Sequence, residues 1–550
     1  IPNNESKGRN MRLRAAMIGV AAAALSLSAC TTMDGAGATA SAGNVPQLQT
    51  AYGAVTGSRE GAANDVNVFR GIRYAATTEG RRFQLAADPE PWTSARPATE
   101  FGSECPQRPS GDVPVFKSWE NSVGTSEDCL FLNVWTRGLS DGKKRPIMVW
   151  LHGGGYVTGS GSSNGYDGSR LAERGDVVVV TLNHRLNGLG YSYLAGLSDD
   201  PKYADSGNLG SLDIVKALEW VRDHADEIGG DAGNVTIFGE SGGAAKVSTL
   251  MGMEQAKGLF QRAIAQSGSM SLAGFTPRLA TPLAKDLMAT AGVSSVEELA
   301  AMPIDDFVEA MMKSRSKAAF YRPVVDGRSL TRQPYAPDAN PVSADIPLLV
   351  GTNNNEMRLQ GGLGSPENFA LTWEQLPAKL TPFVDDADVG EIIAGMRKAH
   401  PDYDASDVFF QVATFRNYRN TALRQAERKS AQAAPVYMYR LDWKTPVEGG
   451  RLETPHALDI AFVFDNVARS LSYTGPETAQ TKRMADLMAD AWIAFARTGN
   501  PNTAALPQWP AYNVQQRATM IFDVDPEVVN DPDSAERELL QRLLPEGRSL

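Results

Sequence analysis

Four short apolar runs stand out along the chain: Ile147–Leu151 (IMVWL), Val177–Leu182 (VVVVTL), Val235–Gly239 (VTIFG) and Pro347–Gly351 (PLLVG). They are rich in β-branched residues and carry almost no polar side chain. A strand with one solvated face alternates apolar and polar positions, whereas a strand covered on both faces reads as a continuous apolar run. The runs therefore predict buried strands of a parallel sheet.

Helical periodicity fills much of the sequence between and after these runs. Residues 208–228 and 484–498 carry apolar side chains at helical spacing, and a Gly-Asn-Pro sequence ends the second helix. Residues 283–316 and 366–432 read as longer, mostly helical stretches. Strands that alternate with helices favour an α/β fold with an open sheet. We predict one such domain with helical insertions that cap the sheet.

The N-terminal region has the pattern of a targeting segment. Met11, Arg12 and Arg14 form a positive start, and the apolar run 15–29 is too short to span a bilayer. The run ends in Leu-Ser-Ala followed by Cys30, which resembles a bacterial lipobox, where the cysteine becomes lipidated. The alternative is a plain signal peptide that ends beside an incidental cysteine.

These patterns divide the chain into four predicted segments. Residues 1–10 are extra residues ahead of a good start methionine, and residues 11–30 form the signal peptide with its lipobox. Residues 31–50 are rich in Gly, Ala, Ser and Thr and read as a flexible tether. The catalytic domain is expected to occupy residues 51–550. We therefore expect an exported bacterial protein, anchored by lipid and facing the periplasm or the cell surface.

Composition excludes several classes of protein. The 550 residues are 42% hydrophobic and 21% charged, which excludes a disordered or fibrous chain. The net charge of −11 argues against a nucleic-acid partner, because such proteins need a basic surface. Three cysteines and five histidines, without zinc-ligand spacing, argue against a disulfide scaffold and a zinc site.

A Gly-x-Ser-x-Gly pattern lies where one predicted strand meets a helix. Residues 234–245 read NVTIFGESGGAA, with Ser241 between Gly239 and Gly243. A nucleophilic serine needs a sharp turn that lifts its hydroxyl above the sheet, and the two glycines leave room for that turn. The alternative is an ordinary glycine-rich strand–helix turn. The strand–elbow–helix context favours the nucleophile.

A second glycine run follows the strand that ends at Leu151. Residues 152–156 read HGGGY, and backbone amides of consecutive glycines can approach a tetrahedral intermediate without hindrance by Cβ atoms. The amide of Gly242, just after the serine, is expected to join them. The alternatives are a flexible loop or a phosphate cradle. A phosphate loop would continue with Gly-Lys-Ser/Thr, which is not the case here.

The order and length of these motifs resemble the type-B carboxylesterase/lipase family, which includes cholinesterases and bacterial para-nitrobenzyl esterases. The resemblance covers nearly the whole body, through VFRGIRYA, SEDCLFLNVW, HGGGYVTGS, NHRLNGLGY, NVTIFGESGG, GTNNNEMR, HALDIAFVF and FARTGNPN in the family's order. It implies an α/β-hydrolase fold, a central mostly parallel sheet flanked by helices, with helical caps around an active-site gorge and without metal or cofactor. It places the oxyanion hole at Gly154, Gly155 and Gly242, and it implies a disulfide between Cys105 and Cys129.

The remaining catalytic residues follow the chain order of the fold, which is serine, acid, histidine. After Ser241 only His400 and His456 remain, and His400 lies at a predicted helix end, where a surface cap is expected. His456, in a loop before an apolar run, matches the family's general base. Glu356 lies just past a strand and matches the family's acid, while Asp326 and Asp459 are rivals.

Departures from the family pattern suggest an unusual acyl pocket. The family usually has a small residue where Lys246 stands, and Lys317 falls on an acyl-pocket position. Arg358 lies two positions after the predicted acid. Cations clustered there would attract a carboxylate-bearing acyl group, as in the tricarballylate esters of fumonisin that one bacterial member of the family hydrolyses. The alternative is that each cation pairs locally or faces water. Trp119 is expected either on the gorge wall or in the core.

These features predict a serine carboxylic-ester hydrolase that works through an acyl-enzyme on small-molecule esters. The substrate candidates are esters with bulky or polycarboxylate acyl groups, or short-chain esters in general. The rival classes are an interfacial lipase, a non-catalytic cholinesterase-like binding protein and a lipid-anchored solute-binding protein. The sequence leaves the oligomeric state open.

Overall fold

The computed structural model describes residues 45–108, 113–121, 123–268, 272–314 and 321–544. In this part of the chain the main feature is an 11-stranded sheet with the order β14-β13-β12-β11-β10-β9-β7-β8-β6-β4-β3. The seven strands from β13 to β8 in that order run parallel to their neighbours, and the strands at both ends pair antiparallel. A small second sheet has the order β1-β2-β5.

The strands of both sheets have the following bounds: β1 Gln47–Thr50, β2 Gly53–Thr56, β3 Ser58–Glu60, β4 Val66–Arg73, β5 Arg96–Pro97, β6 Phe131–Thr136, β7 Arg145–Leu151, β8 Val178–Leu182, β9 Gly230–Glu240, β10 Arg262–Gln266, β11 Leu348–Asn353, β12 Val436–Leu441, β13 Ala518–Phe522 and β14 Glu527–Asn530. The four predicted strands correspond to β7, β8, β9 and β11, so their prediction is confirmed.

Burial on both faces explains why these strands read as unbroken apolar runs. In β7, Ile147 and Val149 belong to the apolar core that also contains residues of α3 (Leu209–Asp223) and α4 (Gly242–Leu250). Met148 and Trp150 belong to a second core, which contains residues of α14 (Ala479–Thr498). Successive side chains of a strand point to opposite faces, so helices on both faces require apolar residues at every position.

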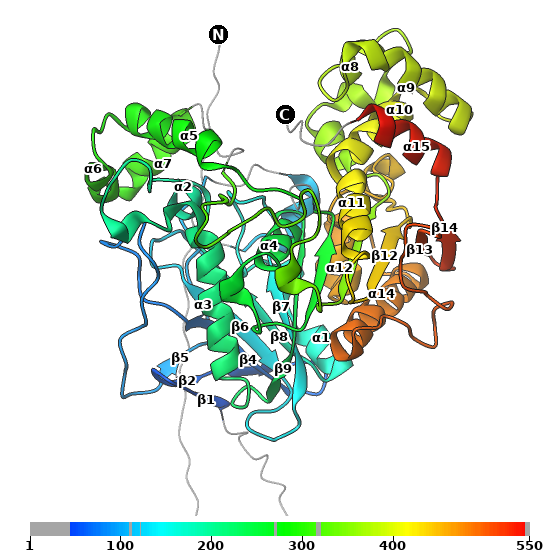
Figure 1. Cartoon of the computed structure of the whole chain (residues 1–550). Coiled ribbons are helices and arrows are strands. Elements are labelled where there is room, and N and C mark those ends of the chain that lie inside the picture. Colours follow the sequence, from blue (N-terminus) through cyan, green and yellow to red (C-terminus); the bar gives the residue numbers. More distant parts are fainter. Residues whose placement is uncertain (1–44, 109–112, 122, 269–271, 315–320, 545–550) are drawn as a thin grey trace, which may run out of the picture. The chain divides into compact units, whose positions relative to one another are not determined.

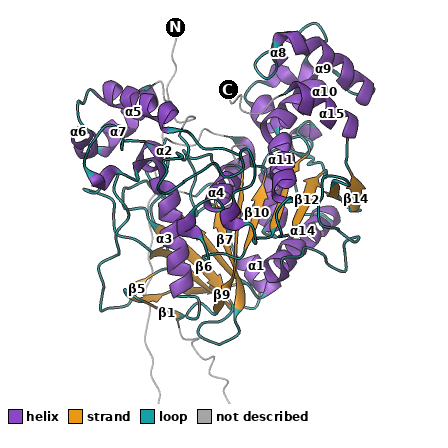
Figure 2. Cartoon of the chain, viewed as in Figure 1, coloured by secondary structure: helices purple, strands orange, loops and turns teal. Residues whose placement is uncertain are grey.

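Helices cover the sheet as predicted, as Figures 1 and 2 show. The helices not yet delimited are α1 Ser169–Gly175, α2 Asn187–Tyr191, α5 Pro277–Ala291, α6 Val296–Ala301, α7 Ile304–Lys313, α8 Leu376–Leu380, α9 Asp386–Ala399, α10 Ala405–Thr414, α11 Asn420–Lys429, α12 Leu458–Val463, α13 Leu471–Thr474 and α15 Ser534–Leu543. The two helical stretches expected as caps form separate groups, α5–α7 and α8–α11 (Figure 1). None of the described helices is long and apolar enough to cross a membrane.

The start of the folded body needs a correction. It was expected near Ala51, but β1 already pairs antiparallel with β2, and Leu48 is buried. The hairpin turns at Ala51–Tyr52. A four-residue strand with alternating exposed and buried positions is too short to show a period, which explains why it resembled the end of a tether.

Candidate active site

Ser241 lies at the sharp turn between β9 and α4 that the Gly-x-Ser-x-Gly pattern predicts. Its φ of 56° and ψ of −120° are unusual for a residue with a side chain, which is the strained backbone expected of a nucleophile elbow. The Ser241 amide donates a hydrogen bond to the carbonyl of Gln266 at 2.8 Å, which ties the turn to β10. Ser241 itself is half-buried and directly follows the end of β9.

Close backbone contacts explain the glycines around the serine. A Cβ atom on Gly239 would lie 2.6 Å from the carbonyl oxygen of Leu151, and one on Gly243 would lie 1.9 Å from the same oxygen. A Cβ atom on Gly242 would lie 2.2 Å from the carbonyl oxygen of Gly155. Larger residues at these positions would separate the elbow from the glycine loop.

The glycine loop comprises residues 152–156, and the side chain of His152 holds the peptide between Gly153 and Gly154. Burial lowers the pKa of His152 well below its usual range, so its imidazole is neutral and its protonated Nδ1 donates to the carbonyl of Gly153 at 2.9 Å. The C=O and N–H of a trans peptide point in opposite directions. The N–H of Gly154, which shares that peptide, therefore faces away from the imidazole.

The next peptide is held in the same manner. The carbonyl of Gly154 accepts a hydrogen bond from the amide of Thr158 at 3.1 Å, which directs the N–H of Gly155 to the opposite side. The φ angles of Gly154 and Gly155 are 84° and 63°, which glycine adopts without strain. Among the described residues, no acceptor binds the amides of Gly154, Gly155 or Gly242. The three amides that the resemblance places in the oxyanion hole thus have no protein acceptor in the described part of the chain.

Glu356 and His456 form the buried acid–base pair that was predicted. Oε2 of Glu356 lies 2.6 Å from Nδ1 of His456, and the two side chains are almost fully buried. The other carboxylate oxygen accepts hydrogen bonds from the hydroxyl of Ser267 at 2.6 Å and from the amide of Asn353 at 2.7 Å. These donors hold the carboxylate, which in turn orients the imidazole.

The second imidazole nitrogen has a neighbour that the sequence reasoning missed. Nε2 of His456 lies 3.2 Å from Oε1 of Glu240 and makes no hydrogen bond to Oγ of Ser241. The geometry between Nε2 and Glu240 is that of an ion pair rather than a hydrogen bond. The signal for Glu240 was its place in the elbow, directly before Ser241. In free enzymes a catalytic hydrogen bond is often long or poorly aligned, and it tightens only when substrate binds.

Charge and burial act against each other at His456. Burial favours the neutral imidazole, but Glu240 and Glu356 outweigh it and raise the pKa of His456 to about 9. Burial also raises the pKa of Glu240 well above its usual range. The protonation states of Glu240 and His456 therefore depend on each other. His456 can act as a base only after its imidazolium form has lost a proton.

The rival acids occupy other places. Asp459 accepts hydrogen bonds from Gln266 at 2.9 Å and from the hydroxyl of Tyr439 at 2.8 Å, and burial raises its pKa to about 6. Asp326 accepts backbone amides of its own turn, including that of Ser329 at 3.0 Å. The structure thus brings Glu356, and neither rival, into hydrogen-bond contact with the imidazole.

His400 lies outside the site, as predicted. It ends α9, and its Nε2 lies 2.9 Å from Oε2 of Glu536 on α15. The hydrogen bond to Glu536 raises the pKa of His400. This histidine joins two helices and is not part of the catalytic pair.

Two of the predicted substrate-binding cations require a correction. Lys246 is fully buried on α4, where its Nζ donates to the carbonyl of His152 at 2.8 Å. Arg358 is almost buried and pairs with Asp407 and, at 3.4 Å, with Glu453. Both side chains are thus engaged within the protein, because burial requires a charged group to find local partners. Lys317 lies outside the described residues, as does Cys30.

Trp119 is part of an aromatic cluster rather than an open wall. Only 5% of its surface is exposed, and its indole nitrogen donates to the hydroxyl of Ser470 at 2.8 Å. It stacks on Phe116 with ring centres 5.5 Å apart and meets Tyr473 edge-on at 5.4 Å. The core position, one of the two alternatives, describes it better.

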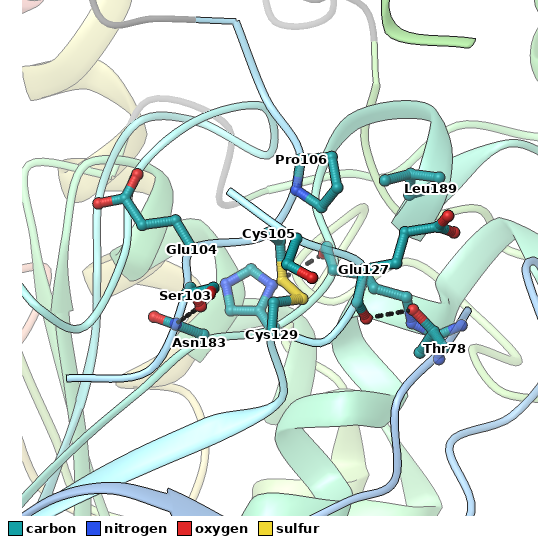
Figure 3. The surroundings of a disulfide bond; sticks show 12 residues. Thr78, Ser103, Glu104, Cys105, Pro106, Glu127, Cys129, Asn183 and Leu189 are labelled. Atoms are coloured by element: carbon teal, nitrogen blue, oxygen red, sulfur yellow. Dashed lines mark hydrogen bonds between the residues drawn. A yellow bond between two sulfur atoms is a disulfide. The ribbon is translucent and has the colours of Figure 1, made fainter. Parts of the chain in front are cut away.

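The predicted disulfide between Cys105 and Cys129 is confirmed (Figure 3). Residues beside Cys105 also contact the segment that follows the glycine loop. Gln107 donates to the carbonyl of Gly159 at 3.0 Å and accepts from its amide at 2.7 Å. Glu104 accepts a hydrogen bond from Ser160 at 2.8 Å. These contacts, which the sequence did not reveal, connect the disulfide to the oxyanion donors.

Comparison with known proteins agrees with this arrangement. A model of the carboxylesterase family matches residues 44–539. Para-nitrobenzyl esterase of Bacillus subtilis (strain 168) is 35% identical over 503 residues, which cover 90% of this chain and 98% of the relative. Fumonisin B1 esterase of Sphingopyxis macrogoltabida is 31% identical over 486 residues, or 83% of each chain. The crystal structure of a carboxylesterase from Geobacillus stearothermophilus, 36% identical, covers 90% of this chain and 100% of its own, with a TM-score of 0.78.

A family match of this length, together with relatives above 30% identity over most of both chains, leaves no other family to consider. The chain therefore belongs to the carboxylesterase family and is a carboxylic ester hydrolase with the α/β-hydrolase fold.

Proposed function

We propose that the chain hydrolyses carboxylic esters through a covalent acyl-enzyme on Ser241. The hydroxyl oxygen attacks the ester carbonyl while His456 takes its proton, and the amides of Gly154, Gly155 and Gly242 bind the resulting oxyanion. His456 then gives the proton to the leaving alcohol. In the second half of the reaction His456 takes a proton from water, which attacks the acyl-enzyme, and then returns the proton to Oγ of Ser241. This step releases the acid and restores Ser241.

The observation that carries this proposal is the meeting of three arrangements at one place. Ser241 stands on a strained turn, three glycine amides beside it have no acceptor among the described residues, and the Glu356–His456 pair lies in the same site. Glu356 accepts the Nδ1 proton of His456, so Nε2 is the nitrogen that acts as the base once it has lost its own proton.

The test is the substitution Ser241→Ala with para-nitrophenyl butyrate as substrate. We expect a fall in kcat of about 10⁴-fold or more, since the nucleophile is lost. Ser248→Ala is the matched control, because Ser248 is a buried serine on the same helix whose hydroxyl bonds the carbonyl of Ala244. Unchanged turnover in Ser241→Ala would contradict the mechanism.

A purely binding role makes a different prediction. A binding protein of this fold has no need of a reactive serine. Phenylmethylsulfonyl fluoride is expected to label Ser241 in the wild type and to leave Ser241→Ala unmodified, as mass spectrometry of the labelled peptide would show. Absence of labelling would favour the binding role.

Short-chain esters in general are the proposed substrates, since the para-nitrobenzyl esterase similarity covers most of both chains. Polycarboxylate acyl esters are the second candidate, supported by the 31% identity to a fumonisin B1 esterase. Lys246 and Arg358 do not support it, because they are engaged elsewhere. Arg322 is the cation to test instead, since its charge acts on Tyr156 of the glycine loop, its guanidinium lies over the ring of Phe275 at 4.7 Å, and no described carboxylate forms an ion pair with it.

Matched rates separate the two candidates. The rates on para-nitrophenyl butyrate and on a tricarballylate monoester would be compared for the wild type and for Arg322→Gln. A preference for the second ester that disappears in the variant would support the polycarboxylate candidate. A preference for the butyrate ester would return the enzyme to general ester hydrolysis.

We also propose that the enzyme is exported and lipid-anchored through Cys30. The positive start, the apolar run and the small residues before Cys30 support this, and the Cys105–Cys129 disulfide fits an oxidising compartment. Metabolic labelling with a radioactive fatty acid is expected to mark the wild type and to leave Cys30→Ser unlabelled. Equal labelling of both would contradict the proposal.

A further inference from the structure

Lys246 is a buried lysine close in sequence to Ser241. Its side chain is fully buried on α4, five residues after Ser241. No described carboxylate lies within ion-pair distance of its ammonium group. Removing an ammonium from water without a counter-ion is costly, and proteins rarely retain such a group for packing alone.

The partner of Lys246 is the first peptide of the glycine loop. Its Nζ donates to the carbonyl of His152 at 2.8 Å, and it lies 5.9 Å from the ring centre of Tyr156 at the other end of the glycines. Because the peptide is planar, this bond also fixes the direction of the Gly153 amide. His152 in turn holds the following peptide through its Nδ1, so Lys246 stands at the start of the chain of contacts that orients the oxyanion donors.

The groups that face Lys246 leave its charge uncompensated. His152 and His184 are stacked 4.9 Å apart, and the positive charge of Lys246, together with burial, lowers the pKa of both. Tyr156 is buried and its pKa is raised to about 12, so it is neutral. On α3, Asp213 is held by Arg185, and on β9 the carboxylate of Glu240 lies 3.2 Å from Nε2 of His456.

We propose that Lys246 is a positioning residue for ester hydrolysis, whose ammonium holds the His152–Gly153 peptide and adds positive charge beside the oxyanion donors. This inference rests on the proposed serine mechanism. The negative charge of a tetrahedral intermediate would favour the protonated side chain, whereas the neutral ester would not. Burial lowers the pKa of Lys246 to about 7, so the ammonium responds to charge that develops nearby. The contribution therefore belongs to the transition state, and its loss should lower kcat rather than raise KM.

The chain offers a matched control in Lys429. It is also fully buried, burial lowers its pKa to about 8, and its Nζ donates to the backbone carbonyl of Ser343 at 2.7 Å. Ser343 precedes β11, whereas Glu356 follows it, so Lys429 and the catalytic pair lie at opposite ends of that strand. A merely structural role of a buried lysine should therefore show equally in both.

The experiment compares Lys246→Met, Lys246→Gln and Lys429→Met with the wild type on para-nitrophenyl butyrate. Circular dichroism and thermal unfolding confirm the fold of each. We expect kcat of Lys246→Met to fall about 10- to 100-fold, somewhat less than for direct loss of an oxyanion donor, with KM within about threefold. Lys246→Gln keeps a hydrogen-bond donor without the charge, and its kcat should lie between. Lys429→Met should lose stability and keep kcat within about twofold.

A second measurement reports on the oxyanion directly. A trifluoromethyl ketone forms a charged hemiketal with the serine, so its inhibition constant for Lys246→Met should rise by the same factor as kcat falls. The proposal is overturned if a folded Lys246→Met keeps kcat within about threefold, if inhibitor affinity stays unchanged, or if neither Lys246 variant folds. If turnover survives Ser241→Ala, the serine mechanism fails and this inference with it; if turnover depends on Ser241 but not on Lys246, only the inference fails.

Discussion

The substitution Glu356→Gln tests how the buried acid works. The amide has the shape of the carboxylate, so packing is preserved while one oxygen becomes an NH₂ group. The Asn353 amide donates to Oε1 of Glu356 at 2.7 Å and cannot reverse its direction. The amide oxygen of the glutamine must therefore face Asn353, and its NH₂ group must face Nδ1 of His456. Because this NH₂ group is a donor, Nδ1 of His456 must be the acceptor. The imidazole proton then lies on Nε2.

That tautomer cannot take the proton of Ser241. The comparable acid-to-amide change in a serine protease lowers kcat about 10⁴-fold through the wrong tautomer, equivalent to about 5.4 kcal/mol in the activation free energy. We expect a loss of this size for Glu356→Gln, with little change in KM. Initial rates on para-nitrophenyl butyrate, at enzyme concentrations high enough to follow slow turnover, provide the assay.

Asp459→Asn is the control for a buried acid-to-amide change nearby. Asp459 bonds Gln266 and Tyr439 rather than the imidazole, so its variant should stay within about tenfold of the wild type. The reasoning would be refuted if a folded Glu356→Gln kept kcat within about tenfold of the wild type. Glu356 would then not set the tautomer of His456, and another carboxylate would have to do so.

Two further predictions concern the protonation of His456 and the disulfide. His456 must be neutral to act as base, and because its pKa is raised, kcat/KM should fall as the pH drops through that pKa. Glu240→Gln removes a neighbouring negative charge, so the acid limb of the pH profile should move to lower pH. An unchanged limb would argue against the contact between Glu240 and His456. The Cys105→Ser/Cys129→Ser variant loses a disulfide between residues 24 positions apart. The chain-entropy model predicts that its free energy of unfolding, measured by urea denaturation, falls by about 3 to 4 kcal/mol. Equal stability of the variant and the wild type would contradict this prediction.

Local pattern predicted four of the parallel strands, for a clear reason. Each of β7, β8, β9 and β11 is covered on both faces, so every position along it had to be apolar, and that leaves a mark in a single stretch of sequence. β1 left no such mark because its four residues alternate between exposed and buried positions. The first residues of the body were therefore missed.

The cations show where sequence reasoning failed. Lys246 departs from the family pattern near Ser241, and Arg358 lies two positions after Glu356, which suggested cations in a common acyl pocket. Lys246 instead points beneath the glycine loop, and Arg358 pairs with Asp407 on α10. The direction of a side chain depends on which helix or strand packs against it, and a linear pattern does not contain that information.

The sequence by itself determined the fold class, the nucleophile elbow, the glycine loop and the candidates for base and acid. These features depend on local backbone demands, such as a turn that only glycines permit, and on a fixed order along the chain. Only the tertiary structure decided that Glu356 rather than Asp459 meets His456, that Glu240 faces the other nitrogen, and that a buried lysine holds the first peptide of the glycine loop. Each of these pairs joins residues on separate strands, helices or loops, so the contact exists only after the sheet has brought the ends of its strands together.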